Sequence, residues 1–343
     1  MGAVVALITL LIVLLSGLTA GLAHQSTAAI ASLNADRIVF GSQHGDVEAS
    51  YSDSVITEEQ LDTWDSADGI TNAAPLGIAS GRLETNNGAG AAISLFGARD
   101  HDDLAPETIT DDGIIIPTDL AEELSLASGD TITMSGHEFT VTDIAGNDAF
   151  SHTPVAWADL SAFHDIMAPR HDGNPPIATV LATNVTDNAD VDAIDSAADT
   201  TSETRTDSFA AIGSFSAENG SLQTMQILLY AISALVVGAF ITVWTIQRSG
   251  DIAVLKALGG STRYLLRDAL SQALLVLLVG TALGGGVASA AGVVAASFVP
   301  FELTIATTLF PVAALIALGM VGSVLAVRRI TSVDPLTALG GVR

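Results

Sequence analysis

The stretch Ala3–Ala23, AVVALITLLIVLLSGLTAGLA, decides the fold class because it contains no charged residue. A helix rises 1.5 Å per residue, so about 20 apolar residues cross the hydrocarbon core of a bilayer, which is about 30 Å thick. Three later stretches are also long and apolar enough, at 222–246, 269–298 and 305–327. The sequence therefore predicts an α-helical membrane protein with four transmembrane helices.

The first stretch also has a feature of a cleaved signal peptide, because the small residues from Thr19 to Ala23 suit a signal peptidase. The basic segment that usually opens a signal peptide is missing, since only the amino terminus carries charge before Ala3. We therefore expect this stretch to remain as a membrane helix. Either the chain starts further upstream or the later loops fix the orientation of this helix.

Charge is distributed very unevenly along the chain. Of the 38 acidic residues, 34 lie between positions 24 and 220, together with only five arginines. Short loops rich in Lys and Arg stay in the cytoplasm. Such residues gather between the second and third apolar stretches and after the fourth: Arg248, Lys256, Arg263, Arg267, Arg328, Arg329 and Arg343. We expect both termini in the cytoplasm of a multi-pass cell-membrane protein, and residues 24–220 outside it.

The external region has the pattern of a mixed α+β domain. Residues 114–116 predict a buried strand, Asp119 and Glu122 have the spacing of a capping box for a helix, and 131–144 predicts a β-hairpin. A helix is expected over 157–167, and a helical stalk is expected to continue from the first span to about Val39. The predicted organisation is a transmembrane helix at 1–23, a large α+β extracytoplasmic domain at 24–220 inserted between the first and second helices, and a membrane domain at 221–343 with a cytoplasmic loop at 247–268 and a cytoplasmic tail at 328–343.

The excess of acidic over basic residues limits the classes of molecule that the chain can bind. A single lysine in the chain is unlike a nucleic-acid binder, which needs clustered Lys and Arg to contact phosphates, so we expect no nucleic acid as a partner. The spacing of an EF-hand calcium loop is absent. We interpret the acidic surface as an adaptation to molar salt, typical of a halophile, and a specific cation site is the alternative.

The usual catalytic motifs are absent from the sequence. It contains no cysteine, no HExxH zinc motif and no GxSxG nucleophile elbow. A Walker A loop needs a lysine followed by Ser or Thr, yet Lys256 is followed by Ala257. We therefore expect no catalytic, cofactor-binding or metal-binding residues and no enzyme activity in this chain. If ATP drives it, another polypeptide must bind the nucleotide.

Small residues in the predicted spans indicate close helix packing. Two pairs of glycines lie four residues apart, Gly17 with Gly21 and Gly280 with Gly284, a spacing that allows helix backbones to approach in lipid. The pairs could serve packing within one chain or a contact between two copies. The four spans contain no Asp, Glu, Lys, Arg or His, so a channel or an ion-coupled transporter is disfavoured.

Three segments together resemble the FtsX/MacB/LolC-type ABC transporter permeases. Residues 245–278, TIQRSGDIAVLKALGGSTRYLLRDALSQALLVLL, are similar to the cytoplasmic loop of that family, which carries an "LKALGAS" stretch. Residues 328–339 resemble its closing "RRxxxxDPxxAL" pattern, and residues 114–144 resemble its MacB-like periplasmic core domain. The missing basic segment before the first span and the acidity of the external domain depart from the family pattern.

The resemblance implies a homodimer or pseudo-symmetric heterodimer in the lipid bilayer, paired with a separate cytoplasmic ABC ATPase subunit. It further implies mechanotransmission, in which ATP-driven closure of the ATPase moves the spans and the external domain. The substrate is unknown and need not pass through the membrane. Export or extraction of a substrate is the leading hypothesis. FtsX-like signalling to an external cell-surface partner and a membrane-anchored receptor without an ATPase are the alternatives.

The cytoplasmic loop has a composition that suits an ATPase contact. Apolar residues at helical spacing fit a groove on a partner, polar residues fit the rim of the contact, and a glycine ends the helix. An ordinary interfacial helix is the alternative. The predicted docking residues are Arg248, Asp251, Ile252, Leu255, Lys256, Leu258, Gly259 and Arg263.

Overall fold

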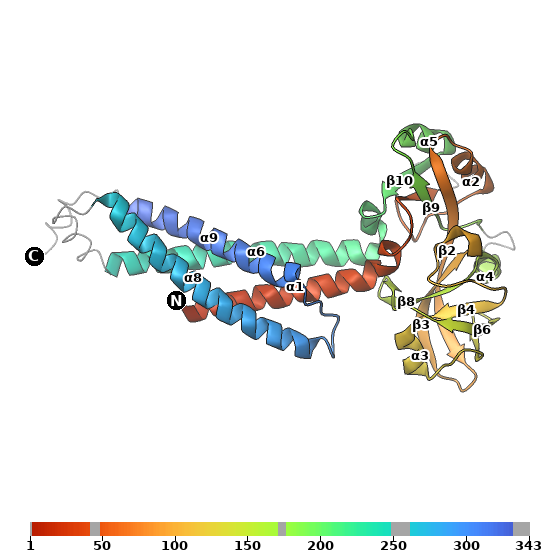
Figure 1. Cartoon of the computed structure of the whole chain (residues 1–343), viewed down its shortest axis with the longest axis horizontal. Coiled ribbons are helices and arrows are strands. Elements are labelled where there is room, and N and C mark those ends of the chain that lie inside the picture. The colour runs from red at the N-terminus through yellow and green to blue at the C-terminus, as the bar shows by residue number, and fades with distance from the viewer. Residues whose placement is uncertain (1, 42–48, 171–175, 248–260, 332–343) are drawn as a thin grey trace, which may run out of the picture. The chain divides into compact units, whose positions relative to one another are not determined.

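The computed structural model describes residues 2–41, 49–170, 176–247 and 261–331. The chain forms two compact units, which we describe separately. The helical unit contains Met1–Leu22 and Asn219–Arg343, and the sheet unit contains Ala23–Glu218. Figure 1 shows long helices in the first and short strands and helices in the second.

Four long helices correspond to the four predicted spans. They are α1 (Gly2–Ala31), α6 (Gly213–Gln247), α8 (Thr262–Ala295) and α9 (Ile305–Thr331). Each contains a segment long and apolar enough to cross a membrane. The third predicted span reaches residue 298, whereas α8 ends at Ala295, after which the chain turns toward α9. Ser261 begins α8, because its Oγ accepts a hydrogen bond from the Tyr264 backbone N–H.

The described residues of the sheet unit form ten strands and several short helices. The strands are β1 (Arg37–Gly41), β2 (Ile70–Thr85), β3 (Gly90–Ala98), β4 (Gly113–Ile116), β5 (Thr131–Met134), β6 (His137–Ile144), β7 (Ala149–Phe150), β8 (Thr153–Asp159), β9 (Val180–Val185) and β10 (Thr200–Thr204). The helices are α2 (Glu58–Asp65), α3 (Thr118–Leu124), α4 (Leu160–Met167) and α5 (Val191–Ala198), with 3-10 turns at Asp100–Asp102, Ala168–Arg170 and Asp207–Ala211.

The long strand β2 joins two parts of the sheet. Its first half pairs with β9, and its second half pairs with β3 and β5. The strand order is β10-β1-β9-β2-β3-β8-β4-β6-β5, and the additional β2–β5 pairing closes the last six strands into a ring. Among the described strand pairs, β3–β8 and β4–β6 are parallel and the others are antiparallel. We call the strands β2, β3, β8, β4, β6 and β5 the strand ring.

In the described part of the sheet unit, three apolar clusters form the core. One includes Ile30 near the end of α1, packed with Phe96 and Trp157. A second fills the strand ring and includes Phe163 from α4. In the third, Trp64 of α2 is fully buried, and its indole N–H donates to Thr200 Oγ1 at 3.0 Å. The α+β character of this unit follows from these helices packed on a mixed sheet.

The sequence identified some elements of the sheet unit and missed others. The predicted hairpin is confirmed by the antiparallel pairing of β5 with β6. The stalk prediction is wrong at its end, because α1 stops at Ala31 and residues 37–41 form β1. The first residues of the predicted helix 157–167 belong to β8. The predicted capping box is also wrong, since Pro117 begins α3 without a side-chain cap.

Candidate functional site

Helices α1 and α8 approach closely at the second predicted glycine pair. A Cβ placed on Gly280 would lie 2.8 Å from Val5 Cβ. A Cβ on Gly284 would overlap the carbonyl oxygen of Ala6 and lie 2.8 Å from Thr9 Cβ. Only glycine leaves room for the α1 backbone here. This pair therefore packs against a helix of the same chain.

A loop packs against the first predicted glycine pair, Gly17 and Gly21. The backbone of Pro300 occupies the space where a Cβ of Gly21 would be, and the ring of Phe301 lies on Gly17. The backbone N–H of Glu302 donates to Gly17 O at 3.0 Å. The connection between α8 and α9 is thus held on the α1 surface. Both glycine pairs have partners within the chain, which favours packing inside one copy over a contact between copies.

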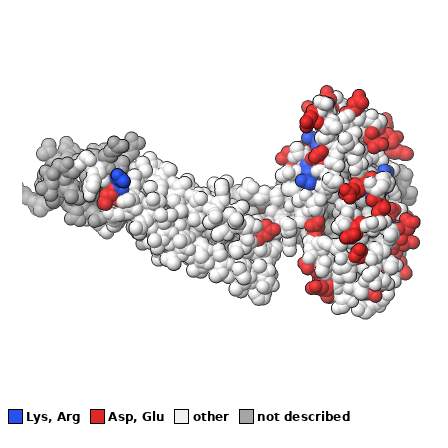
Figure 2. All heavy atoms as spheres, in the orientation of Figure 1, with Lys and Arg blue, Asp and Glu red and all other residues white. Residues whose placement is uncertain are grey.

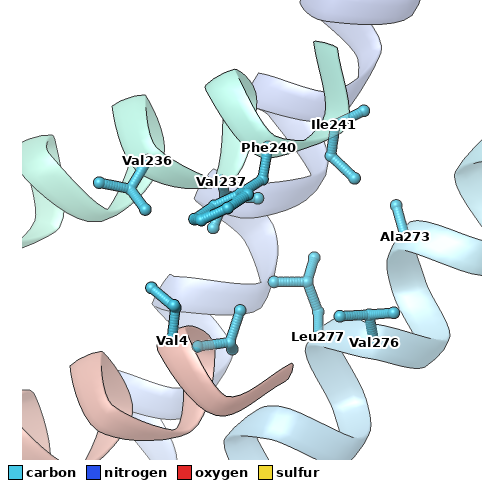
Figure 3. A pocket seen from close by; sticks show the side chains of 9 residues that line it. Val4, Val236, Val237, Phe240, Ile241, Ala273, Val276 and Leu277 are labelled. Atoms are coloured by element: carbon cyan, nitrogen blue, oxygen red, sulfur yellow. The ribbon is translucent and has the colours of Figure 1, made fainter. Parts of the chain in front are cut away.

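A small hollow lies between α1, α6 and α8. Its volume for water-sized groups is about 10 Å³, and Figure 3 shows side chains from all three helices around it. Every lining residue is apolar: Val4, Val5, Val236, Val237, Phe240, Ile241, Ala273, Val276 and Leu277. A hollow without polar partners does not hold ordered water. This region is suited to packing rather than to binding a polar substrate.

The predicted docking loop falls almost entirely outside the described residues. Seven of its predicted contact residues lie in the segment 248–260, which the structure does not describe: Arg248, Asp251, Ile252, Leu255, Lys256, Leu258 and Gly259. Arg263 lies in the first turn of α8, and its side chain is not described. The predicted role of this loop stays a prediction.

The acidic residues of the sheet unit are spread over its surface. Figure 2 shows carboxylates across the visible face of this unit and few charged side chains on the long helices. Within the described part of the chain, no group of three or more His, Asp or Glu side chains is placed to hold a metal ion. Histidines instead contact single carboxylates, as in His137 with Asp165 at 3.6 Å.

Asp102 is the exception, because its carboxylate is buried. Its side chain is 6% exposed, and Oδ2 has no hydrogen-bond partner among the residues that the structure describes. Burial raises the pKa of Asp102, the positive charges of His101 and Arg99 oppose the rise, and Asp65 adds to it. The folded state thus holds this proton more tightly than the unfolded chain. Its contribution to stability is full below the ordinary value of 3.8 and is lost as the pH rises through the raised pKa.

Substitution of Asp102 with asparagine is expected to raise the thermal midpoint at neutral pH, because no charge then has to be buried. At about pH 4 the difference from wild type should shrink. Thermal unfolding of the full chain at both pH values measures this. Asp111→Asn, which changes an exposed carboxylate, is the control. Equal midpoints for wild type and Asp102→Asn at neutral pH would contradict the assignment.

Comparison with known proteins covers nearly the whole chain. Residues 2–201 match the MacB-like periplasmic core domain, and residues 224–335 match the C-terminal region of FtsX-like permeases. The chain belongs to this family of ABC transporter permeases. The permease is 24% identical over 343 residues to the "Putative hemin transport system permease protein HrtB" of Staphylococcus epidermidis, covering 98% of this chain and 94% of that protein.

Other relatives match shorter parts of the permease. The Staphylococcus haemolyticus protein of the same name is 29% identical over 222 residues, covering 63% of this chain and 60% of that protein. An uncharacterized ABC transporter permease of Mycobacterium tuberculosis is 30% identical over 123 residues, or 35% of this chain and 34% of that protein. The crystal structure of the periplasmic region of MacB from Actinobacillus actinomycetemcomitans aligns with a TM-score of 0.38 and 11% identity, covering 52% of this chain and 92% of that one.

Sequence patterns missed several packing residues of the permease. A Cβ on Gly322 of α9 would lie 3.2 Å from Ala234 O, and Gly238 of α6 is its glycine neighbour. A Cβ on Gly319 would lie 2.8 Å from Leu277 Cδ2. A four-residue spacing identifies glycines on one helix, whereas Gly238 and Gly322 are paired across two helices. The only available signal was the presence of glycine in an apolar span.

Proposed function

We propose that this permease is the transmembrane subunit of a transporter that couples ATP hydrolysis by a separate ABC ATPase to movement of the sheet unit. One observation carries the proposal. Helix α1 continues past the unit boundary at Leu22, and α6 begins in the sheet unit and continues past Glu218. Because backbone hydrogen bonds fix the rise per residue, an unbroken helix transmits displacement along its length. Both helices can therefore carry movement between the units.

The proposed orientation places the sheet unit outside the cytoplasm, between the first and second spans. The basic residues after α6 and after α9 support cytoplasmic termini, and the acidic sheet unit supports the opposite side. The segment 247–268 would then face the ATPase. Its apolar residues Ile252, Leu255 and Leu258 would enter a groove, and its charged residues would surround that contact.

We also propose that the permease works as a pair, either with a second copy or with a related chain. Large apolar side chains on α6 are more than half exposed: Met225, Ile227, Leu228, Ile232 and Leu235. In a bilayer they contact lipid or the other member of the pair. The glycine pairs already pack within the chain, so the pairing would use these large side chains.

Movement of the sheet unit could serve either of two functions, transport of a substrate or signalling to an external partner. The names of the Staphylococcus relatives make hemin the first substrate to test for export or extraction. The dry, apolar hollow between α1, α6 and α8 favours the second function, in which the sheet unit switches an external partner and no substrate crosses the helices.

The acidic surface is proposed to be adapted to molar salt. The 34 acidic residues and five arginines between positions 24 and 220 give a net charge of -29, which leaves the sheet unit strongly self-repelling at low ionic strength. At molar salt the Debye length is about 3 Å, so neighbouring carboxylates are screened. Stability that rises steeply with KCl concentration would distinguish this adaptation from a specific cation site, which saturates.

Co-purification with an ATPase tests the coupling proposal. Tagged permease, extracted in detergent at high salt, is expected to retain a cytoplasmic protein with a Walker A motif. Leu255→Asp and Arg248→Glu should each reduce its recovery about ten-fold or more, because a charge at an apolar contact or a reversed rim charge costs several kcal/mol. Quantitative mass spectrometry of the eluate gives the ratio of the two chains.

Matched substitutions control for added charge alone. Ser249→Asp adds an acid to the same loop without removing an apolar side chain, and Arg343→Glu reverses a charge in the tail. Both should retain the ATPase. If wild-type permease retains no ATPase, the coupling proposal is wrong and a receptor without an ATPase becomes the better interpretation.

A further inference from the structure

The two-residue turn between β7 and β8 contacts both helices that leave the sheet unit. The backbone N–H of Ser151 donates to Ser26 O at 3.1 Å, and that of His152 donates to Gln25 O at 3.1 Å. Gln25 and Ser26 lie on α1, close to the unit boundary at Leu22. The turn is therefore attached to α1 where this helix leaves the sheet unit.

The side chains of the same turn reach α6. Ser151 Oγ lies 2.9 Å from Ser214 Oγ. His152 Nε2 lies 3.1 Å from Glu218 Oε1 and 3.0 Å from Ser26 Oγ. Glu218 is the last residue of the sheet unit before α6 enters the helical unit. The Nε2 atom of His152 thus lies between α1 and α6, close to where each helix leaves the sheet unit.

The backbone of this turn is strained, and the contacts account for the strain. Ser151 and His152 have φ values of 49° and 66°, as a type I′ turn requires at both central positions. Asn-Gly is the usual choice there, because side chains larger than glycine disfavour the left-handed region. A strained non-glycine pair that makes bonds to two helices points to a function of the turn itself.

The turn is also connected directly to the strand ring. Strand β8 begins at Thr153 directly after His152 and pairs with β3 on one side and β4 on the other. Thr153 Oγ1 lies 2.6 Å from Ser94 Oγ on β3. The turn that contacts both helices is thus continuous with β8, which lies between β3 and β4 in the ring.

We propose that Ser151 and His152 form the joint that fastens α1 and α6 to the strand ring, with His152 as its positioning residue. The inference rests on the proposed coupling function, in which both helices carry movement into the sheet unit. With its Nε2–H directed at the Glu218 carboxylate, His152 holds a charge-assisted contact across the joint. Loss of this contact frees the exit direction of α6 relative to the ring while the apolar core keeps the sheet unit folded.

Distance measurements between spin labels test the joint in the full chain. The permease has no native cysteine, so labels at Glu123→Cys on α3 and Thr224→Cys on α6 report on these two sites alone. Labelled chain is diluted with unlabelled chain to remove distances between copies. Without nucleotide, His152→Ala should broaden the distribution of distances between the two labels about two-fold, because the contact of His152 with Glu218 is lost.

Rescue and matched controls separate positioning from general loss of structure. His152→Gln places an amide N–H near the position of Nε2 and should restore the wild-type width. His164→Ala removes a histidine whose ring contacts Ile177 O elsewhere in the sheet unit, and it should leave the width unchanged. Amide exchange in β3 and β8 checks that each variant is folded.

The outcomes distinguish the joint from the coupling proposal. If His152→Ala has a distance distribution as narrow as that of wild type, the proposed joint is wrong. If that variant fails to fold, the double variant Ser26→Ala and Glu218→Gln is measured in its place. A distance distribution of wild-type width in the double variant also contradicts the proposed joint. Adding the ATPase with ATP and vanadate should shift the distance in wild type and not in His152→Ala. No shift in wild type contradicts the coupling proposal, whereas the widths measured without nucleotide still decide the joint.

Discussion

Replacing Gly284 with leucine is expected to separate α8 from α1 and to lower strongly the yield of folded permease. The new side chain would collide with the carbonyl oxygen of Ala6 and with Thr9. A backbone atom cannot rotate away as a side chain can, so the helix itself has to shift. Overpacking of this kind costs about 1–3 kcal/mol, and more where backbone is displaced. Thermal stability in detergent, followed by size-exclusion chromatography, measures the effect.

Gly286 provides a matched control on the same helix. A Cβ at Gly286 meets no atom within 4 Å, in contrast to Gly284. Gly286→Leu makes the same chemical change two residues away and should leave the thermal midpoint nearly unchanged. Equal losses in the two variants would show that leucine harms α8 for another reason, and the proposed close contact of α1 with α8 would be wrong.

Replacing Phe163 with alanine is expected to destabilise the sheet unit by about 3–5 kcal/mol, the usual cost of removing a buried phenyl ring. The ring is fully buried and fills the space left by Gly77 on β2, and the Cβ of Phe163 lies against Gly97 on β3. Domains are commonly stable by only 5–15 kcal/mol in total, so this loss brings the unit near unfolding. Denaturant titration followed by the fluorescence of Trp64 and Trp157 measures it.

An exposed position on α4 controls for changes to the helix. Asp165 is 66% exposed, and Asp165→Ala should change the unfolding free energy by less than about 0.5 kcal/mol. Phe163→Leu should recover part of the loss, because it refills some of the volume. A Phe163→Ala variant no less stable than Asp165→Ala would contradict the placement of Phe163 in the apolar cluster that fills the strand ring.

Burial explains which strands were not identified from sequence. Strand β8 is buried on both faces through its middle, so its apolar residues do not alternate and the run into α4 has the pattern of one helix. Strand β1 is buried continuously after Arg37, so its first residues, up to Val39, have the pattern of a continued stalk helix. The hairpin of β5 and β6 was identified because its exposed residues alternate with buried ones and Gly136 marks the turn.

The sequence alone determined the four membrane helices, the separation of charge and the family resemblance, because length, hydropathy and short motifs are local properties of a chain. Only the tertiary structure decided which residues from distant parts of the chain contact one another. It placed Pro300 and Phe301 on the glycines of α1. It also brought His152 to Ser26 and Glu218, which lie 126 and 66 residues away in the chain. Spacing identifies neighbours on one helix, whereas contacts between distant segments depend on how all the apolar surfaces are buried together.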